Sequence, residues 1–230
     1  MRKLILLSIV LVPFFLFAQK HQKSPKTPKA PKTEKPQKTQ KPDKKCANDE
    51  FTGTSRKMAK TTFASPKDAE VFADLASFLG SLPDDKSMTT RNPPISNQPY
   101  FLRVTEENRN VKIAVAYVFA ITRQDDNDFL ITLGSDPDYS KARFFNVEVS
   151  GLPESSKDSY STLNAVRTAV KAQFGNVCGK PMLYMDKPVK VSVAGSLFFD
   201  AENKPGKNDP KKLKSATSWE IHPVAEISFN

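Results

Sequence analysis

Hydrophobic and polar residues alternate with period two in five stretches of the chain, and this alternation predicts five β-strands. In the first stretch, residues 111–121, six apolar or aromatic side chains share one face, whereas small or polar side chains fill most of the other. The remaining predicted strands cover residues 129–133, 143–149, 189–199 and 219–229. Gly195 interrupts the fourth strand, where we expect a bulge or a sharp bend.

Apolar residues at helical spacing predict two helices. The first begins at Ser65, where a capping Ser, a Pro and an early acid follow one another, and it ends before Gly80. Its apolar stripe consists of Val71, Phe72, Leu75, Phe78 and Leu79. The second helix ends at Gly175, and its stripe consists of Leu163, Val166, Ala169, Val170 and Phe174. Residues 84–101 are predicted to be a loop.

The order of these elements predicts a mainly β protein with two helices. After an N-terminal helix come three strands, a helix and two strands (β-β-β-α-β-β), which is the order of the five-stranded OB-fold barrel. A ferredoxin-like fold needs a helix between the first two strands, and the turn at 125–128 leaves no room for one. We therefore expect an OB-like β-barrel domain over residues 101–230, with residues 46–100 forming a helical and loop extension packed on the barrel.

Residues 1–19 have the parts of a signal peptide. Arg2 and Lys3 precede an apolar run over residues 4–17, and Ala18 offers a small residue at the cleavage point. The run is shorter than the roughly 20 residues that span a bilayer, which argues against an uncleaved anchor. We expect cleavage, a secreted or periplasmic protein, and no integral membrane span in the mature chain.

Residues 20–45 form a low-complexity segment rich in Lys and Pro, which we predict to be a disordered linker. Nine lysines recur at every third position from Lys20 to Lys44, and we call them the lysine ladder. Polyproline II has three residues per turn, so in that conformation the ammonium groups would align along one edge. The segment is either a plain spacer or a cationic strip for an anionic polymer, meaning nucleic acid, polysaccharide or a membrane surface.

The formal net charge of +10 is concentrated at the N-terminal end. Residues 20–45 carry a net charge of +8, whereas 23 basic and 23 acidic residues balance from Cys46 onward. A balanced body has no overall electrostatic attraction to polyanions. Any such attraction is therefore expected to belong to the linker.

The chain has two cysteines, Cys46 and Cys178, which excludes a disulfide-dense miniprotein and a four-cysteine zinc site. In an oxidising compartment the two are natural partners for a disulfide bond. That bond would join the end of the linker to the domain. Two unpaired thiols are the alternative.

Four segments resemble a family of uncharacterised, often secreted, bacterial proteins with an OB-like barrel that ends in a Trp-Glu-Ile-His-Pro-Val type strand. The segments are residues 126–129, 148–153, 195–200 and 219–224, the last being the most specific. The resemblance covers roughly residues 100–230 and implies the fold, but it carries no activity. Some members have a His after the acidic turn, where this chain has Leu130.

One group of polar residues near the C-terminus is a candidate for chemistry. Glu220 and His222 are two positions apart, so they project from the same face of the last strand, and Asp200 ends the strand before it. Two carboxylates and an imidazole could bind a divalent metal or perform acid–base catalysis, as in a metal-assisted phosphodiester hydrolase. We favour the alternative in which the three form a structural pin between strands.

The acidic turn is a weaker candidate for a metal site. Asp125, Asp126 and Asp128 could attract calcium, but the turn lacks the Gly and the distal Glu of a calcium-binding loop. A solvated hairpin tip is the preferred interpretation. No cofactor is expected, because the chain has no Gly-rich phosphate loop and a single histidine after the linker, His222.

OB barrels bind oligonucleotides or sugars through aromatic rings on one face. Phe144, beside Arg143, and Phe198 could stack on such a ligand, while Lys211 and Lys212 could contact its phosphates. Both phenylalanines could instead pack beneath the helices. The sequence favours a secreted binding module without catalytic activity that contacts an anionic polymer or the cell envelope. A metal-assisted hydrolase and an envelope protein with a purely structural role are the alternatives.

Overall fold

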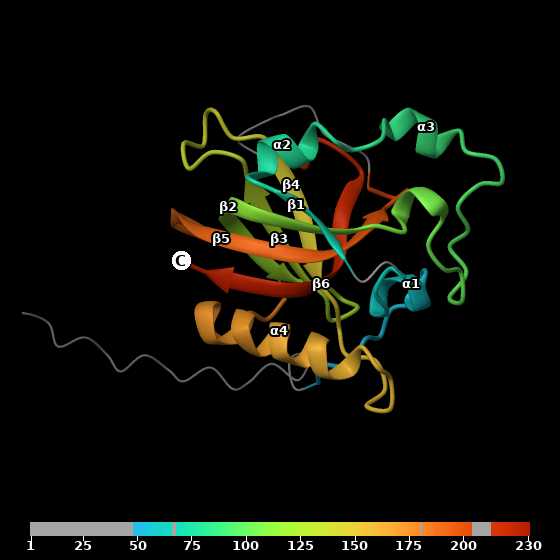
Figure 1. The fold of residues 1–230 in the computed structure, drawn as a ribbon. Coiled ribbons are helices and arrows are strands. Elements are labelled where there is room, and N and C mark those ends of the chain that lie inside the picture. The colour runs from blue at the N-terminus through green and yellow to red at the C-terminus, as the bar shows by residue number, and fades with distance from the viewer. Residues whose placement is uncertain (1–47, 66–67, 180, 204–212) are drawn as a thin grey trace, which may run out of the picture. The chain divides into compact units, whose positions relative to one another are not determined.

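The computed structural model describes residues 48–65, 68–179, 181–203 and 213–230. The chain divides into two units, residues 1–39 and 40–230, and every described residue belongs to the second unit. The predicted signal peptide and linker therefore lie outside the described residues. Within the described part, short helices and one longer helix surround a β-sheet (Figure 1).

Six strands of the described residues form one mixed sheet in the order β1-β2-β3-β4-β6-β5. They are β1 (Ala69–Phe72), β2 (Asn110–Arg123), β3 (Phe129–Gly134), β4 (Phe144–Val149), β5 (Leu183–Phe199) and β6 (Trp219–Phe229). Because β2 also pairs with β5, the pairings run from β2 through β3, β4, β6 and β5 back to β2. The pairs β1–β2 and β4–β6 are parallel, and the others are antiparallel.

Each of the five predicted strands is present, as β2 to β6, but the predicted number and order of elements are wrong. A sixth strand, β1, precedes them, and the described residues contain four α-helices instead of two. β1 pairs in parallel with the start of β2 at the edge of the sheet. The mainly β character of the prediction is confirmed.

The helix predicted from Ser65 is wrong in its first half. Val71 and Phe72 belong to β1, and the helix α2 (Leu75–Leu79) begins only after Asp74. The Asp74 side chain accepts a hydrogen bond from the backbone amide of Ser77 at 2.7 Å, which caps the helix at that point. The predicted apolar stripe thus combines residues of the strand β1 and of the helix α2. The ring of Phe72 contacts that of Phe78, with 5.3 Å between centroids.

Two further helices fall in segments without a predicted helix. α1 (Lys57–Thr61) and α3 (Asp85–Thr89) have five residues each, too few to show a helical repeat in the sequence. A 3-10 turn, η2 (Thr105–Glu107), precedes β2. Residues 46–100 nevertheless contribute to the main core, since Leu75, Phe78 and Met88 belong to the same buried cluster as the strands.

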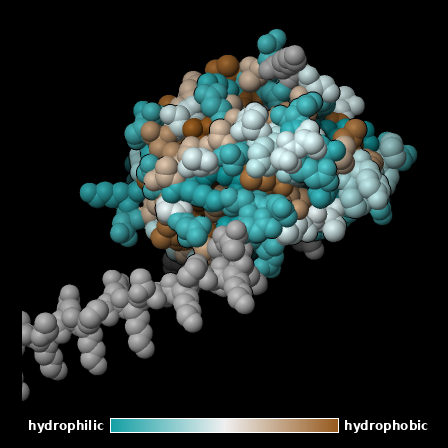
Figure 2. Space-filling model, turned by 90° about the horizontal axis from the view of Figure 1, so that it is seen from below, coloured by the Kyte–Doolittle hydropathy of each residue, from teal (hydrophilic) through white to brown (hydrophobic). Residues whose placement is uncertain are grey.

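The second predicted helix is confirmed as α4 (Tyr160–Phe174). Leu163, Val166 and Val170 are buried, and α4 packs mainly against β6. Gly175 ends the helix with φ 74°, a backbone angle that favours glycine. Figure 2 views the molecule from the α4 side and shows hydrophilic side chains interspersed with smaller hydrophobic areas. The polar face of α4 is therefore turned to solvent.

The irregularity predicted at Gly195 is present in the pairing of β5 with β6. A Cβ atom at this position would lie 2.4 Å from the carbonyl oxygen of Pro223. Only glycine lets the two backbones approach so closely. This close contact with Pro223 lies next to His222 in β6, so it helps to fix the position of the His222 side chain.

Candidate functional site

Four ionisable side chains form a buried cluster where β3, β4 and β6 lie side by side. Asp128 precedes β3, Glu148 is near the end of β4, and Glu220 and His222 share one face of β6. Nε2 of His222 lies 3.2 Å from Oδ2 of Asp128. Nδ1 of the same ring lies 2.9 Å from Oε2 of Glu148 and 3.1 Å from Oε1 of Glu220. All four residues are 5% exposed or less, and we call them the His222 cluster.

Hydrogen bonds orient two of these carboxylates from outside the cluster. Oδ1 of Asp128 accepts from the backbone amide of Gly151 at 2.6 Å, and Oε1 of Glu148 accepts from Nε2 of Gln124 at 3.1 Å. The second oxygens, Asp128 Oδ2 and Glu148 Oε2, are buried without a hydrogen bond to any described residue, although both are at ion-pair distance from His222. Both oxygens therefore lie against the imidazole as ion pairs and favour its protonated form.

Burial and mutual attraction shift the protonation states of the cluster. Burial disfavours the imidazolium, but Glu148 and Asp128 outweigh it and raise the pKa of His222 well above its usual value. Burial, and then the charge of Glu148, raises the pKa of Glu220 to about 8. Burial also acts to raise the pKa of Glu148, but His222 and Lys60 lower it overall. Both shifts favour the protonated forms of His222 and Glu220.

Lys60 of α1 and Asp126 of the turn before β3 extend this network. Lys60 Nζ lies 3.9 Å from Oδ2 of Asp126. Burial acts to lower the pKa of Lys60, but the carboxylates of the cluster raise it overall. Burial and the charge of Asp128 raise the pKa of Asp126 to about 6. The charge of Lys60 therefore offsets part of the negative charge of the cluster.

The structure brings together two of the three residues of the predicted chemical group. Glu220 and His222 are in contact, whereas Asp200 acts on Glu220 only through its charge, which adds to the rise in the pKa of Glu220. The register of β5 and β6 explains this, because Phe198 lies opposite Glu220 and Asp200 lies past the last pair, with its amide bonded to Ser218 O at 3.0 Å. Asp128 and Glu148, which arrive from β3 and β4, surround His222 instead.

The three aspartates of the acidic turn have different surroundings. Asp125 is exposed, Asp126 faces Lys60, and Asp128 enters the His222 cluster. They therefore do not converge on one calcium ion. Only Asp128 belongs to the group of potential metal ligands found in the described residues, which consists of Asp128, Glu148 and His222, with ligand atoms within 4.8 Å of one another.

Neither predicted stacking ring presents a face to solvent. Phe144 is fully buried and makes an edge contact with Phe119, with 5.2 Å between centroids. Phe198 lies between two cations, 4.3 Å from the Arg56 guanidinium and 5.4 Å from the His222 ring. The prediction that these rings stack on a ligand is therefore corrected, since both pack inside the protein. Arg143 is exposed, and its ligand-binding role stays a prediction.

Three of the predicted functional residues cannot be placed. Lys211, Lys212 and Cys46 lie outside the described residues. Phosphate contact by the two lysines therefore stays a prediction. The disulfide bond between Cys46 and Cys178 stays a prediction as well.

A second charged group, which sequence reasoning missed, surrounds Asp49. Its carboxylate pairs with Arg123 at 3.3 Å, with Arg167 at 2.9 Å and with Lys171. We call these four residues the Asp49 clamp. One signal was available in the sequence: Arg167 stands four residues after Leu163 on the buried side of α4, and an arginine at such a position needs a partner.

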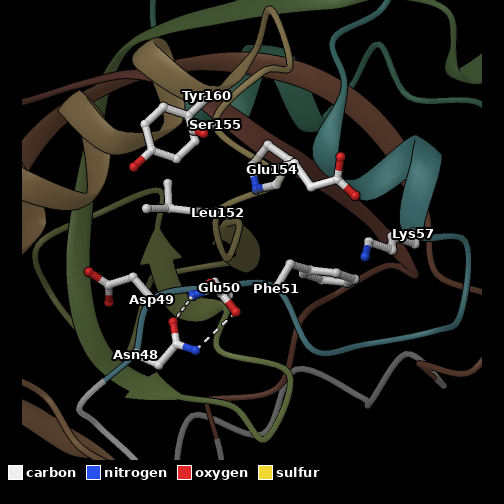
Figure 3. Close-up of a pocket in the computed structure, with 10 residues that line it drawn as sticks. Asn48, Asp49, Glu50, Phe51, Lys57, Leu152, Glu154, Ser155 and Tyr160 are labelled. Carbon is white, nitrogen blue, oxygen red and sulfur yellow. Dashed lines mark hydrogen bonds between the residues drawn. The ribbon is translucent and has the colours of Figure 1, made fainter.

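A pocket of about 500 Å³ lies beside the clamp (Figure 3). Glu50, hydrogen-bonded to Asn48 at 3.1 Å, and Glu154 supply exposed carboxylates to its wall, and Lys57 supplies an amine. The other lining residues are Asp49, Phe51, Leu152, Pro153, Ser155 and Tyr160. The carboxylates make this pocket unsuited to a polyanion.

No protein-family model, curated protein or solved structure matches the chain. Among the described residues, no helix has both the length and the apolar character to cross a bilayer.

Proposed function

We propose that the chain is an exported, non-catalytic binding module, secreted or periplasmic, that binds an anionic polymer through its lysine ladder. The observation that carries this proposal is the separation of charge: residues 20–45 have a net charge of +8, whereas the body from Cys46 onward is balanced. A cationic strip binds nucleic acid or acidic polysaccharide by releasing condensed counterions, without a shaped site. The body would then hold the ladder at the cell envelope.

We propose further that the body is an OB-like barrel of the family that the sequence resembles. Two observations support this. The strand pairings run from β2 through β3, β4, β6 and β5 back to β2. In the sequence, α4 lies between β4 and β5, which are the third and fourth of these five strands. β1 is then an addition at the edge of the barrel.

The burial of the His222 cluster supports a role without catalysis. A catalytic acid, base or metal must reach the reacting atoms of a substrate, usually within hydrogen-bond distance. His222 and Asp128 are 0% exposed and Glu220 is 1% exposed, so no substrate reaches them in this conformation. The alternative hydrolase would also need Asp200 beside Glu220 and His222, and Asp200 lies beyond the last pair of β5 with β6.

A salt titration of polyanion binding tests the proposal. We would measure the affinity of the full chain for fluorescently labelled single-stranded DNA and heparin between low and physiological salt. The test variant changes five ladder lysines to Gln: Lys23, Lys26, Lys29, Lys32 and Lys35. If all five contact phosphates, the slope of log affinity against log salt should fall by about 3.5 for single-stranded DNA.

A matched control removes the same charge from the body. It changes the exposed Lys86, Lys141, Lys157, Lys187 and Lys190 to Gln. We expect this variant to keep most of the affinity and of the salt slope. Equal losses in both variants, or no binding by the full chain, would show that the ladder is not the binding element.

The hydrolase alternative has a separate test. We would incubate the full chain with DNA and with bis(4-nitrophenyl) phosphate in the presence of Mg²⁺, Mn²⁺ or Zn²⁺. We expect no turnover. Cleavage that is lost in Glu220→Gln and retained in the exposed-strand variant Glu226→Gln would replace the binding proposal with a catalytic one.

A further inference from the structure

A second hydrophobic cluster lies on the outer side of the sheet, apart from the main core. Phe119 and Ala120 of β2 belong to it, whereas Val118 and Ile121 of the same strand belong to the main core. A strand turns its side chains to opposite faces, and the register shift between Val118 and Ala120 lets two successive residues reach the outer face. The buried members of this second cluster are Phe119, Ala120, Ala142, Phe144 and Leu213.

Three tyrosines lie on or beside the second cluster. Tyr117 of β2 packs against it and is half-buried. The ring of Tyr139 contacts the ring of Phe144, with 5.5 Å between centroids. Tyr184 of β5 is paired with Ala120 of β2, so these two side chains share one face of the sheet. The second cluster thus supports tyrosines from β2, from β5 and from the connection between β3 and β4.

Two of these rings are open to solvent. Tyr139 is 38% exposed and Tyr184 is 63% exposed. The ring of Tyr139 also contacts that of Phe119, at 5.7 Å between centroids, so packing on the inner side holds it in place. Tyrosine offers a large, rigid contact area at a low cost in conformational entropy, which suits both rings to stacking on a flat ligand.

Exposed cations flank the same cluster. Arg143 and Lys214 each directly follow a member of the second cluster in the sequence, and both are exposed. Asp138, the acid beside Tyr139, pairs with Lys141 at 3.2 Å, so its negative charge is offset. The surface therefore combines rings that can stack with cations that can contact phosphates. We call Tyr139, Tyr184, Arg143 and Lys214 the tyrosine surface.

We propose that the tyrosine surface binds single-stranded nucleic acid, with bases stacked on Tyr139 and Tyr184, while the lysine ladder supplies most of the electrostatic attraction. This inference rests on the proposed function and selects one class among the anionic polymers. Nucleic acid carries a flat aromatic ring on every residue, whereas an acidic polysaccharide such as heparin carries none. A single strand is favoured over a duplex because its bases are free to leave their neighbours and stack on side chains.

Binding of the full chain to labelled oligo-dT and to heparin over a range of salt concentrations tests the proposal. Tyr184→Ala removes one stacking ring, so its affinity for oligo-dT should fall by about fivefold to a hundredfold, the factor that one stacked base contributes. The slope of log affinity against log salt should stay the same, because no charge is removed. Tyr184→Phe keeps the ring and should keep the affinity. Heparin should bind Tyr184→Ala like the unchanged chain.

Tyr100→Ala is the matched control, because Tyr100 is 80% exposed and lies between α3 and η2, in a segment that contributes no member to the second cluster. It should bind oligo-dT like the unchanged chain. Unchanged affinity of Tyr184→Ala for oligo-dT would overturn the proposal, and so would an equal loss for heparin. If the ladder variant loses its salt slope while Tyr184→Ala binds normally, this inference alone fails. If Tyr184→Ala loses affinity while the ladder variant keeps its slope, the proposed role of the ladder fails instead.

Discussion

The His222 cluster and the Asp49 clamp are opposite arrangements of charge within one small body. In the cluster, one imidazole lies among three carboxylates, with each ring nitrogen 3.2 Å or less from a carboxylate oxygen. In the clamp, one carboxylate lies among two guanidinium groups and an ammonium group. Each group therefore surrounds one central ionisable side chain with several groups that can carry the opposite charge.

The two groups satisfy their charged side chains in different ways. Arg167 donates to the carbonyl oxygens of Asn127 and Ser150, at 2.9 and 3.0 Å, besides pairing with Asp49. Arg123 likewise donates to the carbonyl of Asn48. A guanidinium has five donors and can use backbone carbonyls, whereas an ionised carboxylate only accepts. The arginines of the clamp thus share their charge between Asp49 and backbone carbonyls, although Arg123 Nε, Arg123 Nη1 and Arg167 Nε have no hydrogen-bond partner among the described residues. The cluster instead relies on the raised pKa of Glu220 and on the ammonium group of Lys60.

The largest expected effect comes from removing the centre of the clamp. Asp49→Asn leaves the buried Arg123 and Arg167 without a carboxylate, and their side chains are only 2% and 1% exposed. Removing one partner of a buried ion pair lowers the free energy of unfolding by about 3–5 kcal/mol. We expect a loss of that size in the free energy of unfolding, measured by urea denaturation.

Asp138→Asn is the control for that experiment, because Asp138 pairs with Lys141 on the surface, with exposures of 46% and 70%. It should leave the urea midpoint nearly unchanged. A midpoint for Asp49→Asn that matches the control would mean that the carbonyl contacts alone satisfy the two arginines.

A smaller effect separates the two groups by pH. The pKa of His222 and of Glu220 is raised in the folded state, so their contribution to stability is lost as pH rises, for Glu220 through about 8. Burial acts to raise the pKa of Asp49, but Lys171 and Arg167 lower it overall, so its contribution is lost as pH falls below the usual carboxyl range. The His222 cluster should therefore contribute less to stability as pH rises toward 8, and the Asp49 clamp should contribute less as pH falls below the usual carboxyl range.

Glu220→Gln isolates the alkaline part. The amide is neutral at every pH and can still accept from Nδ1 of His222, so stability should change little below pH 4.5, where Glu220 is protonated in both the folded and the unfolded chain. As pH rises from 4.5 to about 8, urea midpoints should fall less for this variant than for the unchanged chain, so the variant should be the more stable of the two at pH 8. The acid limb should be the same in both. A parallel alkaline loss in the two proteins would show that Glu220 does not titrate there.

Burial alternates at the start of β2 and at the end of β6, so a period of two is visible there in the sequence. β3 and β4 are buried along nearly their whole length and could be predicted as short runs rich in apolar residues. The start of α2 could not, because residues of β1 and α2 together imitate one helical stripe. Elements of five residues, such as α1, have too little periodicity to detect.

Half of the His222 cluster could be predicted, because Glu220 and His222 are neighbours on one strand. The choice of Asp128 and Glu148 over Asp200 depends on strand register, which no local pattern specifies. Asn146 of β4 lies opposite Glu220, so Glu148, two residues further on, reaches the same face. Three strands and two long-range pairings must be in place before these side chains meet.

The smallest expected effect comes from a residue beside the cluster. Leu130 lies directly opposite Glu148 in the pairing of β3 with β4, so the two side chains share a face, and Leu130 is half-buried. Leu130→His would place a second imidazole beside the Glu148 carboxylate, and a pair of opposite charges directly across two strands contributes about 0.2–1 kcal/mol. We therefore expect the urea midpoint of Leu130→His to exceed that of Leu130→Gln below pH 6, where the new imidazole is charged, and to match it at pH 8. Equal midpoints at both pH values would mean that position 130 does not reach Glu148.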